Sequence, residues 1–72
     1  MRRHLDLRGI KCPLSWAHAR ARLEAMARGE ELELLLDDPQ GARDIPRAAE
    51  ASGHQVIATV AEGGLWRITI EA

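Results

Sequence analysis

Alternating polar and apolar positions predict strands near both ends of the chain. Residues 4–7 alternate in this way and then reach a turn-forming Arg-Gly pair, which indicates a short first strand. Near the C-terminus, residues 55–60 and 66–70 alternate on either side of a pair of glycines. Two such runs around a glycine pair predict an antiparallel hairpin. One face of its first strand is predicted to carry Val56, Ala58 and Val60.

Apolar positions with helical spacing follow the first strand. Residues 13–28 are mostly good helix formers, and Gly29 is a typical helix terminator. The apolar side chains fall within a stripe about 100° wide, as in an amphipathic helix that covers a core. The members of this stripe are Trp16, Ala19, Leu23, Met26 and Ala27. We therefore predict a helix over residues 13–28.

The middle of the chain predicts a second strand and a second helix. Residues 30–37 return to strand spacing. One face of this strand carries Leu32, Leu34 and Leu36. A strand, a helix and a strand in close succession form a crossover unit in which the two strands are parallel. Residues 44–52 then have the spacing of a short helix, for which Asp44 is the predicted N-cap.

The predicted order of elements is βαβαββ, which indicates an α+β fold. Two helices would cover one face of a four-stranded mixed sheet, as a two-layer α/β sandwich. A chain of 72 residues is long enough for one modest core, so we expect a single domain over residues 1–72. No apolar run approaches the length of a membrane span or a secretory signal, so we expect a cytoplasmic protein.

Charge is unevenly distributed along the chain, although the net charge is only −1. Residues 1–29 hold seven Arg and Lys against two acids, whereas residues 30–72 hold three against nine. The segment around Cys12, the single cysteine, is therefore locally cationic. A net charge near zero weighs against direct nucleic-acid binding, which favours a dense basic surface. The three histidines have no ligand-like spacing, so no metal site is predicted.

The position of Cys12 favours a reactive thiol over a buried apolar filler. Proline is preferred at the first helical position, so Pro13 predicts that Cys12 is the N-cap of the first helix. The sulfur would then face the free amides of Leu14 and Ser15 and the positive end of the helix dipole. Helix N-termini favour the thiolate, which is the nucleophilic form of cysteine.

Two cations and one leucine extend this candidate site. Arg8 and Lys11 place positive charge near the sulfur, which also favours the thiolate. Leu14 points away from the apolar stripe of the helix, so we predict an exposed contact for a docking protein. The predicted site therefore has Cys12 as its reacting residue. Its thiolate-stabilising or docking residues are Arg8, Lys11, Pro13, Leu14 and Ser15.

Several short motifs occur in order along nearly the whole chain. Residues 5–13 read Leu-Asp-Leu-Arg-Gly-Ile-Lys-Cys-Pro. The motifs that follow are the Gly29 break, Asp37-Asp38-Pro39, Asp44-Ile45-Pro46, Gly53-His54 and the strand that contains Trp66. As an ordered set, they resemble the TusA (SirA-like) family of sulfur carriers. The resemblance implies the βαβαββ sandwich that the periodicity also predicts.

The resemblance further implies that Cys12 holds sulfur as a persulfide. The sulfur would come from a cysteine desulfurase or a rhodanese-like donor and pass to an acceptor protein. Pathways served across the family include tRNA thiolation, molybdenum-cofactor synthesis and sulfur metabolism. Such a sulfurtransferase-type carrier acts with partner enzymes, and the resemblance implies no metal or organic cofactor.

The chain departs from the family pattern Cys-Pro-x-Pro at Ser15, where the family has a second proline. Serine restores a backbone N–H, which we expect to donate to the Cys12 sulfur. Asp37 and Asp38 precede a proline at the end of a predicted strand. We interpret them as turn and capping groups rather than as an acid–base pair.

Two other classes of function are also compatible with the sequence. Small βαβαββ folds occur in regulatory and RNA-binding domains, since fold does not determine function. A lone reactive cysteine also suits a thiol redox sensor that transfers no sulfur. Loading of Cys12 with persulfide sulfur distinguishes a carrier from both.

Overall fold

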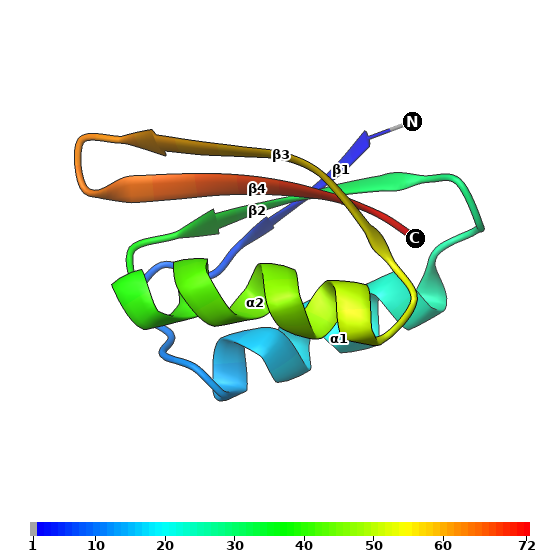
Figure 1. Ribbon diagram of the computed structural model, residues 1–72, viewed down its shortest axis with the longest axis horizontal. Helices are drawn as coiled ribbons and strands as arrows, with labels where there is room; N and C mark the ends of the chain where they lie inside the picture. Colours follow the sequence, from blue (N-terminus) through cyan, green and yellow to red (C-terminus); the bar gives the residue numbers. More distant parts are fainter. Residues whose placement is uncertain (1) are drawn as a thin grey trace.

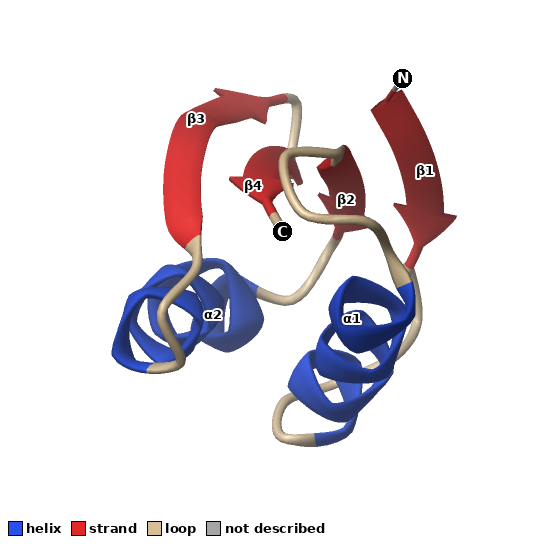
Figure 2. Cartoon of the chain, turned by 90° about the vertical axis from the view of Figure 1, so that its right-hand side faces the viewer, coloured by secondary structure: helices blue, strands red, loops and turns tan. Residues whose placement is uncertain are grey.

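Two helices cover one face of a four-stranded sheet in the computed structural model, which describes residues 2–72 (Figure 1). The elements in chain order are β1 (Arg2–Asp6), α1 (Leu14–Ala25), β2 (Glu31–Leu36), α2 (Pro39–Ala51), β3 (Gln55–Glu62) and β4 (Leu65–Glu71). The helices lie next to each other on the same side of the sheet (Figure 2). The predicted α+β sandwich with the order βαβαββ is confirmed.

The sheet is mixed, with the strand order β1-β2-β4-β3. β1 and β2 are parallel, and β4 pairs antiparallel with both β2 and β3. A parallel pair requires a long crossover connection, which α1 supplies. Because β1 and β2 run in the same direction, the loops that follow them leave the sheet at the same edge.

The core lies between the sheet and the two helices. The residues that form it are Leu7, Ala19, Leu23, Leu32, Leu34, Leu36, Ile45, Ala49, Ile68 and Ile70. The strand register aligns these side chains, since Leu34 pairs with Leu5 in β1 and with Ile68 in β4. The three alternate leucines of β2 are fully buried, as predicted. Trp16 and Trp66 are half-buried and pack against the same core.

α1 is shorter than the sequence predicts. The helix covers Leu14–Ala25 and not residues 13–28. Met26 has an extended backbone, with a ψ of 155°, which ends the helix. Ala27 is exposed and does not belong to the core stripe. The chain reverses at Gly29, whose φ of 91° is a conformation that glycine adopts without strain.

The prediction for the start of α2 is wrong. The helix begins at Pro39, and its N-cap is Asp38 rather than Asp44. The Asp38 carboxylate accepts the N–H groups of Gln40 at 3.2 Å and Gly41 at 3.3 Å. A proline at the first helical position has no N–H that needs a partner, so Asp-Pro is a strong start signal. The sequence interpretation assigned this pair to the strand end instead.

A β-bulge in β3 changes which of its side chains share a face. Val56 and Ala58 pair with neighbouring residues of β4 instead of alternate ones, so the register shifts between them. The extra residue, Ile57, turns Ala58 and Val60 away from the face that carries Val56. The prediction that these three residues share one face is therefore wrong. Ile57 and Val60 remain 44% and 51% exposed.

Candidate functional site

Cys12 lies in the loop between β1 and α1, at the sheet edge where both parallel strands end. The residue is half-buried, and its peptide bond to Pro13 is cis. The N-cap of α1 is Pro13, and no side chain caps this helix. The prediction that Cys12 is the N-cap is therefore wrong by one residue, and the Pro13 carbonyl accepts the Ala17 N–H at 3.1 Å.

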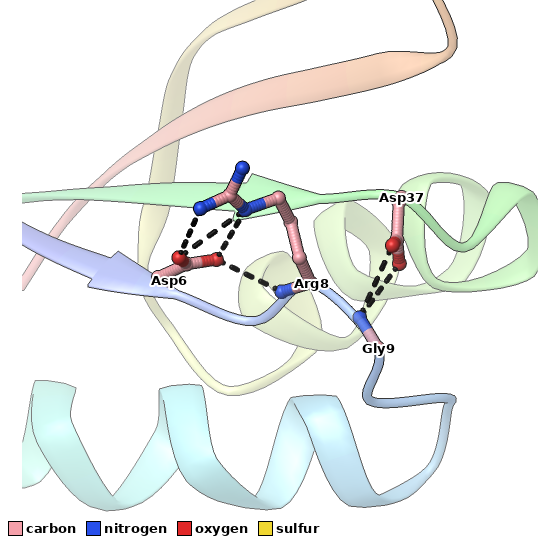
Figure 3. A network of polar contacts seen from close by, with 4 residues as sticks. All are labelled: Asp6, Arg8, Gly9 and Asp37. Carbon is pink, nitrogen blue, oxygen red and sulfur yellow. Dashed lines mark hydrogen bonds and ion pairs between the residues drawn. The ribbon is translucent and has the colours of Figure 1, made fainter.

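The segment after β2 holds the Cys12 loop by two carboxylates. The Cys12 N–H donates to Asp38 Oδ2 at 3.0 Å. The Gly9 N–H donates to both oxygens of Asp37, at 2.9 and 3.1 Å (Figure 3). The interpretation as a capping group is confirmed for Asp38, the N-cap of α2, while Asp37 binds Gly9 in the loop after β1. Sequence reasoning missed that they bind the cysteine loop, although parallel pairing of β1 and β2 would have indicated it.

Arg8 is engaged by a neighbouring carboxylate. Its Nη2 lies 2.8 Å from Asp6 Oδ2, and its backbone N–H donates to Asp6 Oδ1 at 3.0 Å (Figure 3). The Arg8 side chain and N–H lower the pKa of Asp6 from 3.8 to about 2. The guanidinium of Arg8 is therefore paired with the carboxylate of Asp6.

Lys11 is exposed and adjoins Cys12 directly. The pKa of the Asp38 carboxyl is lowered below its usual value, chiefly by the N–H of Cys12. The N–H groups of Gln40 and Gly41 and the charge of Lys11 act in the same direction. Asp38 is thus a carboxylate at neutral pH and accepts hydrogen bonds through both oxygens.

Ser15 is buried at the start of α1. Its N–H donates to the Lys11 carbonyl at 3.1 Å, so the expectation that this group donates to the Cys12 sulfur is wrong. The Ser15 side chain is 0% exposed, and its Oγ has no hydrogen-bond partner among the described residues. A Cβ atom added at Gly41 would lie 3.4 Å from Ser15 Oγ. The side chain therefore faces α2 and not a docking protein.

Leu14 is 57% exposed, immediately after the Cys12-Pro13 pair. It begins an exposed row of apolar residues along the outward face of α1, at positions three, seven and eleven residues further on. The row consists of Leu14, Ala17, Ala21 and Ala25. Sequence reasoning singled out only Leu14, although the same helical spacing predicts the whole row.

The site has the character of a surface loop. Within residues 2–72, no group of three or more His, Cys, Asp or Glu side chains could hold a metal ion. A shallow pocket is lined by residues of β1, β2 and β4, and Cys12 does not contribute to it. Over the same part of the chain, no helix is both long and apolar enough to cross a membrane. Cys12, the single cysteine of the chain, lies on this loop with its backbone N–H bonded to Asp38.

Comparison with known proteins gives a consistent result. The family model described as sulfurtransferase TusA matches residues 3–72. The sulfur carrier protein TusA of Allochromatium vinosum is 31% identical over 67 residues, which are 93% of this chain and 88% of that protein. A protein of Archaeoglobus fulgidus, described as a candidate sulfur carrier, is 37% identical over 68 residues, which are 93% of this chain and 77% of that protein.

A solved structure agrees with the fold. The crystal structure of a SirA-like protein from Desulfitobacterium hafniense superimposes with a TM-score of 0.85. The match covers 100% of this chain and 97% of that chain, at 24% sequence identity. At this identity the likeness establishes the arrangement of helices and strands, independently of any shared chemistry.

Proposed function

Because the chain belongs to the TusA family of sulfur carriers, we propose that Cys12 holds sulfur as a persulfide and relays it between partner proteins. The observation that carries this proposal is the placement of the only cysteine on a surface loop that is fixed at its backbone. A carrier needs its thiol within reach of other proteins, and a loop at the sheet edge provides that access.

The proposed transfer needs no oxidant. The Cys12 thiolate attacks the outer sulfur of a donor persulfide, R–S–SH. The new S–S bond forms at Cys12, the S–S bond of the donor breaks, and the donor leaves as the thiolate R–S⁻. The product is Cys12–S–SH, from which an acceptor thiolate takes the outer sulfur by the same exchange and restores the Cys12 thiolate.

Charge and apolar surface around Cys12 support docking of a partner protein. Lys11 is exposed next to the sulfur-bearing residue, where it presents a positive charge to a partner protein. Leu14 is 57% exposed and leads into the apolar row on α1. Arg8 contributes by shaping the turn through Asp6. Pro13 is exposed at the start of α1, where a partner reaches it, while Ser15 supports the loop from within.

The donor in this proposal is a cysteine desulfurase or a rhodanese-like protein, and the acceptor is a protein of tRNA thiolation, molybdenum-cofactor synthesis or sulfur metabolism. Each of these donors presents a cysteine persulfide, which is the chemical group that Cys12 would attack. The cytoplasm is the proposed compartment, because reducing conditions keep a lone thiol out of disulfides.

Intact mass spectrometry under non-reducing conditions tests the proposal. Wild type and Cys12→Ser are incubated with a cysteine desulfurase and cysteine. We expect a gain of about 32 Da per sulfur in wild type alone, reversed by a reductant. Absence of the gain with several active donors would exclude the carrier function. Reversible oxidation of Cys12 without sulfur uptake would instead support a redox sensor.

A further inference from the structure

We propose that Asp38 is the positioning residue of Cys12, and that it fixes the sulfur-bearing residue through its backbone N–H. The inference rests on the proposed function, because it concerns how the same cysteine is held for transfer. Asp38 lies 26 positions from Cys12 in the sequence. No role beyond capping α2 follows from its position in the chain alone.

One carboxylate serves two elements at once. Asp38 Oδ2 accepts the N–H groups of Cys12 at 3.0 Å and of Gly41 at 3.3 Å. Asp38 Oδ1 accepts the N–H of Gln40 at 3.2 Å. The same side chain that starts α2 therefore anchors the loop that precedes α1.

The peptide unit between Lys11 and Cys12 is held at both of its polar ends. Its carbonyl accepts the Ser15 N–H at 3.1 Å, and its N–H donates to Asp38 Oδ2 at 3.0 Å. A peptide unit is planar and rigid, so two bonds on opposite sides define its orientation. The Cα atom of Cys12, which belongs to this plane, is thereby placed between the first turns of the two helices.

Packing restricts movement of the Asp38 carboxylate. A Cβ atom added at Gly41 would lie 3.4 Å from both Asp38 Oδ2 and Ser15 Oγ. Gly41 is buried, and the Ser15 side chain is 0% exposed. The carboxylate therefore lies near the place where Ser15 of α1 faces Gly41 of α2.

Charge strengthens this anchor at neutral pH. Three backbone N–H groups and the charge of Lys11 keep Asp38 ionised, and hydrogen bonds to an ionised acceptor are about twice as strong as neutral ones. Asp37 adds a second negative charge next to it and engages the Gly9 N–H. In-line attack on a persulfide is sensitive to placement, since a displacement of about 1 Å costs about 100-fold in rate.

Two substitutions separate positioning of Cys12 from capping of α2. In Asp38→Ser, the hydroxyl still caps the helix, but the shorter side chain does not also reach the Cys12 N–H. In Asp38→Asn, the amide oxygen takes the place of Oδ2 and still accepts from Cys12 and Gly41, while the amide nitrogen that replaces Oδ1 no longer accepts from Gln40. Asp37→Ser is the matched control, because that carboxylate binds Gly9 and not Cys12.

Amide hydrogen exchange, followed by NMR, tests the anchor itself. In Asp38→Ser we expect the Cys12 amide to exchange about tenfold faster or more, while the Gly41 amide stays protected. In Asp37→Ser the Cys12 amide should exchange as in wild type. In Asp38→Asn, whose neutral amide oxygen is a weaker acceptor, the Cys12 amide should exchange faster than in wild type but more slowly than in Asp38→Ser. Unchanged protection of Cys12 in Asp38→Ser would overturn the inference.

The rate of sulfur transfer tests whether the anchor at Asp38 matters for the reaction of Cys12. Each protein is loaded chemically with polysulfide and mixed with an acceptor thiol, and the rate of sulfur loss from Cys12 is measured. We expect Asp38→Ser to be about tenfold slower than wild type and Asp38→Asn to be within about twofold of it. Equal rates for wild type and Asp38→Ser would overturn positioning, and equal losses in both Asp38 variants would assign the effect to charge.

The rate at which iodoacetamide alkylates Cys12 tests this inference without any sulfur transfer, and so independently of the carrier function. If wild type takes no sulfur from any desulfurase, the carrier proposal fails, yet alkylation still reports how Cys12 is held. The inference then predicts an altered alkylation rate in Asp38→Ser and a rate near that of wild type in Asp38→Asn. The same rate in all three proteins would overturn it.

Discussion

The two helices lie next to each other on the same face of the sheet, but they begin and face the solvent in different ways. α2 starts with a proline and is capped by Asp38, whereas α1 starts at Leu14 with no side-chain cap. The outward face of α2 carries Gln40, Arg43, Arg47 and Glu50. The outward face of α1 carries Leu14, Ala17, Ala21 and Ala25.

This difference indicates different roles for the two helices. α2 stabilises the fold, whereas α1 also exposes a surface next to the Cys12 loop. α2 has a cap, a buried face and a polar outer face, which is the pattern of a helix that stabilises a small domain. α1 also has a buried inner face, but its first turn follows the cysteine loop. Its outer face carries an apolar row between exposed polar residues, which are His18, Arg20, Arg22 and Glu24. The anchor for that loop comes from the cap residue of α2, since Asp38 accepts the N–H of Cys12.

The largest effect is expected on the inner face of α1. Leu23 is 2% exposed, so Leu23→Ala should lower the free energy of unfolding by about 2–5 kcal/mol. Urea unfolding measures this loss. A loss below about 1 kcal/mol would mean that α1 contributes little to the core, and the contrast between its two faces would not hold.

Removal of the cap of α2 is expected to have the next largest effect. Asp38→Ala leaves the N–H groups of Gln40 and Gly41 without their acceptor, and should lower the thermal midpoint by about 5 °C. Asp44→Ala is the control, because Asp44 lies inside the helix and is not its cap. Thermal unfolding followed by circular dichroism distinguishes them. Equal shifts in both variants would contradict the assignment of the cap.

Acid should weaken the same cap without any substitution. The pKa of Asp38 is lowered, chiefly by the Cys12 N–H, so its stabilising contribution is present above about pH 4. This contribution is lost as the pH falls through the lowered pKa. Asp6, with a pKa of about 2, should behave in the same way. Urea midpoints measured at decreasing pH should fall less steeply in Asp38→Asn than in wild type; identical slopes would contradict the assignment.

Ser15→Ala is expected to give a small gain in stability. The buried hydroxyl has no partner among the described residues, and an unsatisfied buried polar group is costly. Removal of the oxygen should raise the free energy of unfolding by about 0.5–1 kcal/mol, as measured in urea. A loss of stability would indicate that Ser15 Oγ makes a bond across to α2.

The smallest effect on stability is expected on the outer face of α1. Leu14→Ala should change the free energy of unfolding by less than about 0.5 kcal/mol, because the side chain is 57% exposed. It should slow sulfur transfer to a protein acceptor but not to a small thiol. Ala25→Ser, at the far end of the row, serves as control. Equal slowing with both acceptors would exclude docking as the cause.

Most of the fold followed from local periodicity, and the exceptions have specific causes. The start of α2 was misplaced because Asp38-Pro39 marks a strand end as well as it marks a helix start. The bulge at Ile57 was missed because alternation in β3 continues in sequence while the pairing register shifts. The start of α1 was misplaced by one residue, since proline is compatible with either of two adjacent positions.

Some features of the candidate site could be predicted from the sequence, and others could not. Cys12 stood out in the sequence as the only thiol, and the exposure of Leu14 followed from helical spacing. The ion pair between Arg8 and Asp6 could not be predicted, because proximity in sequence does not show which charges pair in space. The burial of Ser15 depends on where α2 packs, which no local pattern contains.

The sequence by itself determined the order of the elements, the inward face of β2 and the position of the single cysteine. Each of these depends on the spacing and chemistry of residues close together in the chain. Only the tertiary structure decided that the carboxylate of Asp38 binds the N–H of Cys12, 26 positions away. That contact exists because β1 and β2 are parallel and end at the same edge of the sheet, which is a property of their pairing and not of either segment alone.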